Sequence, residues 1–258
     1  MNHHEIIVKD TPLQAAITGA DLFVENARIS VTQSGSFAVA ISGGSTPRPM
    51  HRLLAQEPYC SKIPWSRTEL FWVDERCISV EDPASNYGMA RTDFLNQVPI
   101  PKDQVHPILA DLSPEQGAQA YTRRLIDFFH LHRANFPVFD LIYLGIGLDG
   151  HTASLFPGQD ALDETERLVM SVKGGDPYVS RITLTFPVIN RAKRIVFMVS
   201  GRGKADTLRT ILECPEAGLP AQRVRPLKGS LTWLLDNESA SMLSKERFPR
   251  GPRHEKHG

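Results

Sequence analysis

The sequence predicts one α/β domain with a doubly wound, mainly parallel sheet and helices on both faces. Short, almost continuous apolar runs such as Phe37–Ile41 and Phe139–Leu144 are typical of strands buried on both sides. Segments with apolar residues at helical spacing alternate with these runs, as in proteins whose parallel strands are joined by helices. The 258 residues contain no repeat or compositional shift that would mark a linker, so one large core is expected.

The first half of the chain alternates between strands and helices. Ile6–Val8 is a short strand candidate, and Thr11-Pro12 opens a helix whose apolar face extends to about Thr32. Three further apolar runs are predicted as strands: Phe37–Ile41, Leu70–Val73 and Val105–Ile108. Three helices are expected beside them: Pro47–Ala55, Pro83–Gln97 and one that begins at a Ser113–Gln116 capping box.

The second half continues the alternation. Four segments are predicted as strands: Leu168–Val172, Arg181–Phe186, Arg194–Ser200 and Leu231–Leu235. A helix is expected at Lys204–Leu212, and Asp236 is expected to cap a closing helix that ends at Leu243. Residues 247–258 are polar, basic and proline-containing, so we predict a domain over residues 1–246 and a disordered tail at 247–258.

Composition argues against several classes of partner. Lys+Arg and Asp+Glu both total 29, which gives no overall charge to attract nucleic acid or a membrane surface. The three cysteines are odd in number and widely spaced, which favours a reducing cytoplasm and no metal cluster. No signal-peptide core or membrane-length apolar run is present. We expect a cytoplasmic protein that is a monomer or a weak homodimer.

The stretch Phe139–Pro157 carries the strongest chemical signal. Its apolar strand is followed by three glycines, an acid and an imidazole: Gly145, Gly147, Gly150, Asp149 and His151. Open α/β sheets bind ligands at the carboxyl ends of their strands, where such a turn would lie. With an unperturbed pKa of about 6.5, a histidine can take a proton from water near neutrality. His151 is therefore a candidate general base with Asp149 beside it, and a structural histidine is the alternative.

The three glycines also fit the spacing of a dinucleotide fingerprint, G-x-G-x-x-G. That fingerprint needs a long helix directly after the third glycine and an acid at the end of the next strand. Here Pro157-Gly158 interrupts the chain, and Leu168–Val172 is followed by Lys173. We therefore expect no nicotinamide or flavin cofactor.

A second glycine turn follows Phe37–Ile41. It contains Gly43, Gly44, Ser45 and Thr46 and ends at a proline that suits a helix start. Free backbone N–H groups, hydroxyls and a helix N-terminus can together cradle a phosphate, although this is not a Walker loop. An ordinary capped turn is the equal alternative.

Two cations also follow predicted strands. Arg76 comes after Asp74-Glu75, where its planar guanidinium could face an anion or a solvated corner. Lys204 begins a helix, a position where a cation opposes the helix dipole. An anion in front of Lys204 would explain its presence.

Together these segments resemble the 6-phosphogluconolactonases. The matching motifs, in order, are ISGGSTP at 41–47, WVDER at 72–76, SNY at 85–87, GIGLDGHTASLFP at 145–157, RITLT at 181–185, LPAQ at 219–222 and WLLD at 233–236. The resemblance covers roughly residues 5–245. It implies a modified Rossmann-like sheet without a dinucleotide, as in the glucosamine-6-phosphate deaminases and ribose-5-phosphate isomerases.

The resemblance also implies roles for individual residues. His151 matches the catalytic histidine of the family, and Arg76 matches a substrate-binding arginine. The 43–46 turn (Gly43, Gly44, Ser45 and Thr46) matches its phosphate loop. Lys204 corresponds to a phosphate-contacting lysine of the wider superfamily, and Arg181 is a further candidate for substrate binding.

The implied reaction is hydrolysis of 6-phospho-D-glucono-1,5-lactone to 6-phosphogluconate without a metal or cofactor. His151 would activate water, and Asp149 would orient or stabilise the imidazolium. The oxyanion would be stabilised by Arg76 or by N–H groups of the glycine turn. The deaminase branch is the nearest alternative, but it has a glutamate where this chain has Phe156 and a tyrosine where it has Arg76. A sugar-phosphate-binding regulator without activity is a second alternative.

Overall fold

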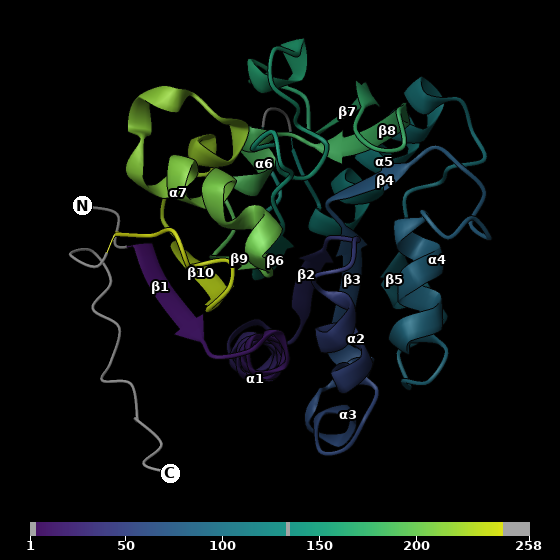
Figure 1. Cartoon of the computed structure of the whole chain (residues 1–258). Coiled ribbons are helices and arrows are strands. Elements are labelled where there is room, and N and C mark those ends of the chain that lie inside the picture. Colours follow the sequence, from purple (N-terminus) through teal and green to yellow (C-terminus); the bar gives the residue numbers. More distant parts are fainter. Residues whose placement is uncertain (1–3, 133–134, 245–258) are drawn as a thin grey trace.

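The computed structural model describes residues 4–132 and 135–244 and contains the expected parallel sheet (Figure 1). Seven strands form it: β1 (His4–Lys9), β2 (Phe37–Ile41), β3 (Thr68–Trp72), β5 (Val105–His106), β6 (Leu141–Leu144), β9 (Arg194–Val199) and β10 (Ser230–Asp236). They lie in the order β1-β10-β9-β6-β2-β3-β5, and each neighbouring pair is parallel. The prediction of a mainly parallel sheet is confirmed.

The order of the strands reverses between β2 and β6. From β2 the chain moves outward through β3 to β5, returns to β6 on the other side of β2, and moves outward again through β9 and β10. Such a switch point opens a crevice at the carboxyl ends of the two central strands. The two glycine-rich turns, at 42–47 and 145–150, begin at this crevice.

Helices cover both faces of the sheet. They are α1 (Pro12–Ser34), α2 (Arg48–Leu54), α3 (Tyr59–Lys62), α4 (Asn86–Ala90), α5 (Pro114–Phe129), α6 (Phe186–Ile189) and α7 (Ala205–Glu213). α1 packs against α2, β2 and β10, and α7 lies on the opposite side of the sheet (Figure 1). The expected starts of α1 and α5 are confirmed, since Thr11 caps α1 and Ser113 and Gln116 form a capping box on α5. Gly35 ends α1 with a φ of +80°.

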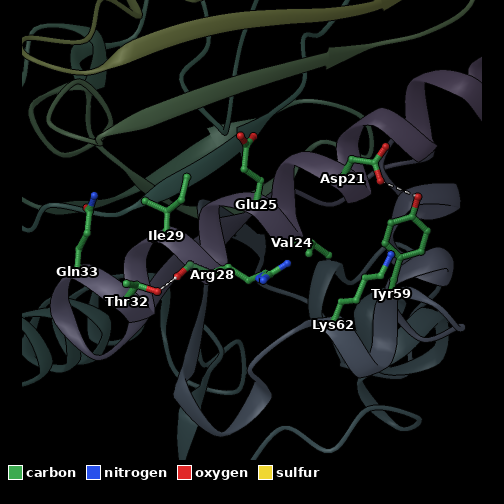
Figure 2. A pocket seen from close by; sticks show the side chains of 9 residues that line it. All are labelled: Asp21, Val24, Glu25, Arg28, Ile29, Thr32, Gln33, Tyr59 and Lys62. Carbon is green, nitrogen blue, oxygen red and sulfur yellow. Dashed lines mark hydrogen bonds between the residues drawn. The ribbon is translucent and has the colours of Figure 1, made fainter.

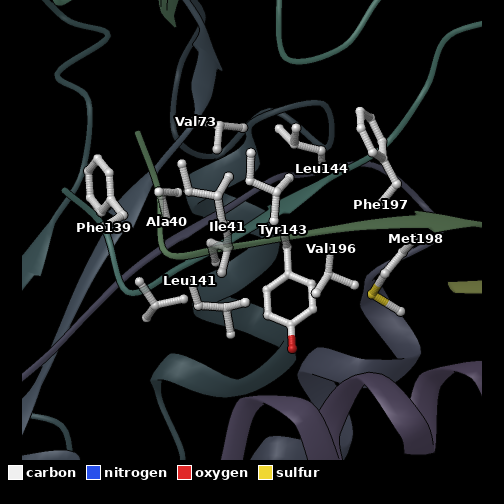
Figure 3. Packing of buried hydrophobic residues seen from close by; sticks show 14 of the residues in the cluster. Ala40, Ile41, Val73, Phe139, Leu141, Tyr143, Leu144, Val196, Phe197 and Met198 are labelled. Atoms are coloured by element: carbon white, nitrogen blue, oxygen red, sulfur yellow. The ribbon is translucent and has the colours of Figure 1, made fainter. Parts of the chain in front are cut away.

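Side chains from alternate strand positions build the core on both faces (Figure 3). On one face Tyr143 points toward α1, where its hydroxyl donates a 2.7 Å hydrogen bond to the Gly19 carbonyl. Met198 points to the same side. On the other face Phe197 stacks on Trp233, with ring centroids 4.1 Å apart. This packing fixes β6 and β9, and with them the turns that leave their carboxyl ends.

A second sheet departs from the single sheet that the sequence predicted. It is antiparallel and contains β4 (Asp74–Arg76), β8 (Val179–Leu184) and β7 (Val169–Gly174) in that order. Val73 joins the two sheets, because its N–H donates to the Ile41 carbonyl and its own carbonyl accepts from the Leu184 N–H. The chain leaves the main sheet there, and this places β4 beside the crevice.

The helix expected over 83–97 is shorter and changes type. Ser85 caps it as predicted, since its side chain accepts a 3.0 Å hydrogen bond from the Gly88 N–H. α4 then covers only Asn86–Ala90 and continues as a π-helical turn over Arg91–Leu95.

The closing helix predicted after Asp236 is wrong. The Asp236 carboxylate does accept from the Ser239 N–H at 2.7 Å, as a cap would, but the residues up to 243 form turns. The Ser239 hydroxyl bonds to the carbonyls of Val199 and Asp236, and such local side-chain bonds compete with a helix. The predicted tail at 247–258 lies outside the described residues.

Candidate active site

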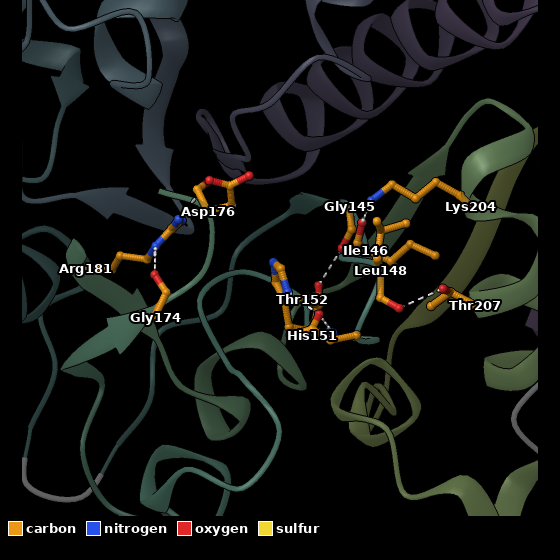
Figure 4. Close-up of polar contacts among 11 residues, drawn as sticks. Gly145, Ile146, Leu148, His151, Thr152, Gly174, Asp176, Arg181, Lys204 and Thr207 are labelled. Carbon is orange, nitrogen blue, oxygen red and sulfur yellow. Dashed lines mark hydrogen bonds and ion pairs between the residues drawn. The ribbon is translucent and has the colours of Figure 1, made fainter. Parts of the chain in front are cut away.

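The crevice is a cleft of about 630 Å³ at the carboxyl edge of the main sheet. It brings together all of the residues that the sequence singled out: Gly43, Gly44, Ser45, Thr46, Arg76, Asp149, His151, Arg181 and Lys204. In Figure 4 the ring of His151 stands between Arg181 on one side and Lys204 on the other. The imidazole and the 43–46 turn therefore share one cleft.

His151 and Asp149 form a close pair. Asp149 Oδ1 lies 2.5 Å from His151 Nδ1, and it also accepts from the His151 backbone N–H at 3.1 Å. A carboxylate accepts hydrogen bonds, so of the two neutral tautomers of the ring this contact favours the one with its proton on Nδ1. Nε2 is then the nitrogen that can accept a proton.

The same contacts keep Asp149 ionised. Burial opposes ionisation, but the hydrogen bonds from the His151 N–H and ring, together with the charge of that ring, outweigh it and hold the pKa of Asp149 below its ordinary value. A lasting negative charge beside Nδ1 stabilises an imidazolium when the ring takes a proton.

The loop around His151 needs glycine at 147. A Cβ at this position would lie 2.0 Å from His151 Nδ1 and 2.6 Å from Asp149 Oδ1. No side chain fits there unless the pair moves. Gly147 therefore allows the His151–Asp149 pair to fold back over the loop.

The start of α7 holds the outer part of this loop (Figure 4). Lys204 Nζ donates to the Ile146 carbonyl at 2.9 Å, and the Thr207 hydroxyl donates to the Leu148 carbonyl at 2.9 Å. Burial lowers the pKa of Lys204 from its ordinary value, and the nearby Asp149 partly opposes this shift. Lys204 thus both positions the loop and brings a cation into the cleft.

Three N–H groups of the glycine turn and its end already have acceptors within the loop. The Gly147 N–H donates to the His151 carbonyl at 2.8 Å, and the Gly150 N–H donates to the Gly147 carbonyl at 3.2 Å. The His151 N–H is bound to Asp149.

The 43–46 turn is different. Within the described residues, none of its four backbone N–H groups and neither of its hydroxyls donates a hydrogen bond. Gly44 has a φ of +90°, a backbone conformation that glycine adopts readily. An anion in the cleft would therefore meet unoccupied donors.

Arg76 and Arg181 lie opposite each other in the β4–β8 pair. Neither forms an ion pair with a carboxylate in the described parts of the chain, and Arg76 Nε is buried without a partner there. Burial first, and then the neighbouring Arg76 guanidinium, lower the pKa of Arg181 from its ordinary value. Two adjacent guanidinium groups make this wall of the cleft attractive to negative charge.

Arg181 also has a structural task that the sequence did not indicate. Its side chain is 3% exposed. Its Nε donates to the Gly174 carbonyl at 2.8 Å, and Nη2 donates to the carbonyls of Asp176 and Pro177 at 3.3 and 3.2 Å (Figure 4). Arg181 therefore anchors the β7–β8 hairpin against the cleft.

The two acids before Arg76 have separate functions. Glu75 accepts from the N–H groups of Asn86 and Tyr87 at 2.8 and 2.7 Å and so caps α4, outside the cleft. Asp74 lines the cleft and accepts a 2.6 Å hydrogen bond from the Ser154 hydroxyl. Asp74 and Asn86 are two of the polar cleft residues to which the sequence gave no role.

Two further features bear on sites outside the cleft. The described residues contain no group of three His, Cys, Asp or Glu side chains that could hold a metal ion. A hollow between α1 and α3 has Asp21 bonded to Tyr59 at 3.0 Å, with Ile29 on its apolar wall (Figure 2). It contains neither a histidine nor a glycine turn.

Comparison with known proteins points to one family. The model of the family described as glucosamine-6-phosphate isomerases/6-phosphogluconolactonase matches residues 10–233. A 6-phosphogluconolactonase from Synechocystis is 41% identical over 90% of this chain and 98% of its own, and one from Rattus norvegicus is 39% identical over 93% of each. The solved 6-phosphogluconolactonase from Trypanosoma cruzi superposes with a TM-score of 0.84 at 30% identity, covering 95% of this chain and 98% of its own.

Proposed function

The chain belongs to the glucosamine-6-phosphate isomerase/6-phosphogluconolactonase family, and from this premise we propose how its cleft works. It hydrolyses 6-phospho-D-glucono-1,5-lactone to 6-phospho-D-gluconate, a step of the oxidative pentose phosphate pathway. The mechanism that we propose is general-base catalysis by His151, with the phosphate of the substrate held at a distance from the reacting carbon.

Binding begins at the phosphate. The free N–H groups and hydroxyls of the 43–46 turn donate to its oxygens, and the Lys204 ammonium adds a charge-assisted hydrogen bond. A phosphate held in this way places the lactone ring over His151. Fixing the remote end removes much of the entropic cost of bringing the carbonyl carbon and the attacking water together.

The chemical step is an addition followed by an elimination. Nε2 of His151 takes a proton from a water molecule while the water oxygen forms a bond to C1 of the lactone. The bond between C1 and the ring oxygen then breaks, and the imidazolium returns its proton to that oxygen. The product is an open-chain alcohol with a carboxylic acid, which ionises at neutral pH. Asp149 stabilises the imidazolium between the two steps.

Arg76 is the proposed stabiliser of the oxyanion at C1. It lines the cleft, has a buried Nε without a partner in the described residues, and carries no ion pair there that would neutralise it. Its Nη1 donates to the Ala84 carbonyl, which fixes the side chain in place. A preorganised cation stabilises negative charge that develops on the carbonyl oxygen.

The environment of His151 disfavours the deaminase alternative. At the position of the deaminases' glutamate, this chain has the buried Phe156, whose ring centroid lies 4.6 Å from that of His151. An apolar ring cannot relay the proton that ring opening of an amino sugar requires. The same packing leaves His151 with one acidic partner, Asp149, among the described residues.

We propose a cytoplasmic monomer or weak homodimer. The three cysteines are free, which suits a reducing compartment. Among the described helices, none has the length and apolar character needed to span a bilayer.

One observation supports this mechanism more than any other: a histidine paired through Nδ1 with a carboxylate shares a cleft with a turn of unoccupied N–H donors. The experiment is a coupled assay with freshly made lactone, in which enzyme-dependent loss is measured against spontaneous opening. Loss well above the spontaneous rate is expected. Binding of 6-phosphogluconate with no acceleration would instead favour a sugar-phosphate-binding regulator.

A further inference from the structure

Asn86 is the most deeply buried polar residue of the cleft that has no part in the mechanism. It is 2% exposed and lines the cleft at the start of α4. Its backbone N–H is held by Glu75 at 2.8 Å, so its position does not depend on its side chain alone. A buried amide in such a place needs a structural or functional reason.

The orientation of the amide is determined by its neighbours. Nδ2 donates to the Asp74 carbonyl at 2.9 Å and approaches Asp74 Oδ1 at 3.3 Å. Both groups accept hydrogen bonds, so the nitrogen must face them and the oxygen must face the other way. Asn86 Oδ1 is buried and has no hydrogen-bond partner in the described residues.

That oxygen lies directly against the 43–46 turn. A Cβ at Gly43 would lie 1.8 Å from Asn86 Oδ1 and 2.3 Å from Cγ. The φ of Gly43 is not in the left-handed region, so the amide, rather than the backbone, requires a glycine here. The turn therefore rests on the side chain of Asn86.

On its other side Asn86 connects to the loop of His151. Asp74 Oδ2 accepts a 2.6 Å hydrogen bond from the hydroxyl of Ser154, which is fully buried three residues after His151. A continuous series of contacts thus runs from Gly43 through Asn86, Asp74 and Ser154 to the catalytic loop. Asn86, Asp74 and Ser154 are all buried, and hydrogen bonds of 2.9 Å and 2.6 Å link them, which makes this part of the series stiff.

We propose that Asn86 is a positioning residue that sets the distance between the 43–46 turn and His151. The inference rests on the proposed function, in which the turn holds the phosphate and His151 acts at C1. If the spacing is wrong, the substrate's phosphate and its carbonyl carbon cannot both be in place. Removing the amide should therefore weaken substrate binding more than it slows the chemical step.

The test is a double-mutant cycle of Gly43→Ala and Asn86→Ala, with KM, kcat and thermal midpoint measured for each variant. Each single change should raise KM about tenfold and lower kcat by less than about threefold. In the double variant the new methyl group occupies the space left by the amide. Its KM should therefore rise much less than the product of the two single effects.

Asn190→Ala is the matched control. Asn190 also bonds to backbone groups, of Arg223 at 3.0 Å and Arg225 at 2.8 Å, but it lies outside the cleft. Its loss should lower the thermal midpoint and leave KM unchanged. If Asn86→Ala does not fold, Gly43→Ala alone tests the same contact from the other side.

Two results would overturn the inference while leaving the proposed function intact: an unchanged KM in Asn86→Ala, or KM effects that multiply in the double variant. Failure of the proposed function looks different, because the wild-type protein would then not accelerate loss of the lactone. The wild-type assay and the mutant cycle therefore distinguish the two failures.

Discussion

Asp149 Oδ1 lies 2.5 Å from His151 Nδ1, and the one residue between them, Gly150, has a φ of +78°. The chain turns back on itself within three residues, so that the acid contacts the side of the ring remote from Nε2. A fixed tautomer and a permanent countercharge follow from this one contact.

Asp149→Asn keeps the shape of the side chain and removes its charge. The imidazolium then loses its stabilising partner, and the amide can present its nitrogen to Nδ1 and favour the wrong tautomer. We expect kcat to fall about tenfold to a hundredfold with little change in KM. Steady-state kinetics on fresh lactone measure both, and an unchanged kcat would remove Asp149 from the mechanism.

Gly147→Ala tests whether the loop requires the open space beside His151. A methyl group would lie 2.0 Å from Nδ1, so the pair must separate and kcat should fall at least tenfold. Gly203→Ala is the control, because a Cβ there has no neighbour within 4 Å and the residue lies outside the cleft. Equal activity of the two variants would show that the close packing at Gly147 is not needed.

We expect the binding of 6-phosphogluconate to depend on pH through the charge of Lys204. Because burial lowers its pKa, the ammonium loses its proton as the pH rises through a value below the ordinary lysine range. Binding should be strongest on the acid side of that value and weaken above it. Calorimetric titration of 6-phosphogluconate between about pH 8 and pH 11 measures this. The Lys204→Arg variant stays charged and should show a flatter profile, whereas parallel profiles for the two proteins would contradict a charge contact with phosphate.

The sequence predicted the main sheet well because its strands are continuous apolar runs that only a doubly covered sheet can bury. It did not predict the second sheet. Asp74–Arg76 is polar throughout and has no strand-like pattern. It becomes a strand because Val73, directly before it, is hydrogen-bonded both to Ile41 in the main sheet and to Leu184 in the second sheet. The period-two alternation in Arg181–Phe186 was the available sign of a different, antiparallel sheet.

The positions of the two glycine turns and of Lys204 were predictable because carboxyl ends of neighbouring parallel strands meet at one edge, whereas Arg76 and Arg181 lie on the second sheet. What could not be predicted were contacts made across the cleft. Nothing near Asn86 in the sequence shows that its amide supports Gly43, and nothing near Arg181 shows that it holds three carbonyls of the β7–β8 hairpin. Such contacts depend on how two distant turns pack, and sequence periodicity does not describe that packing.

The most direct test of the mechanism is the turnover number of His151→Ala with fresh lactone, measured together with the affinity for 6-phosphogluconate. General-base catalysis by Nε2 predicts that kcat falls about a hundredfold or more, while the product still binds with wild-type affinity because the 43–46 turn, Arg76 and Lys204 remain in place. Turnover at the wild-type rate in this variant would contradict the assignment of His151 as the base.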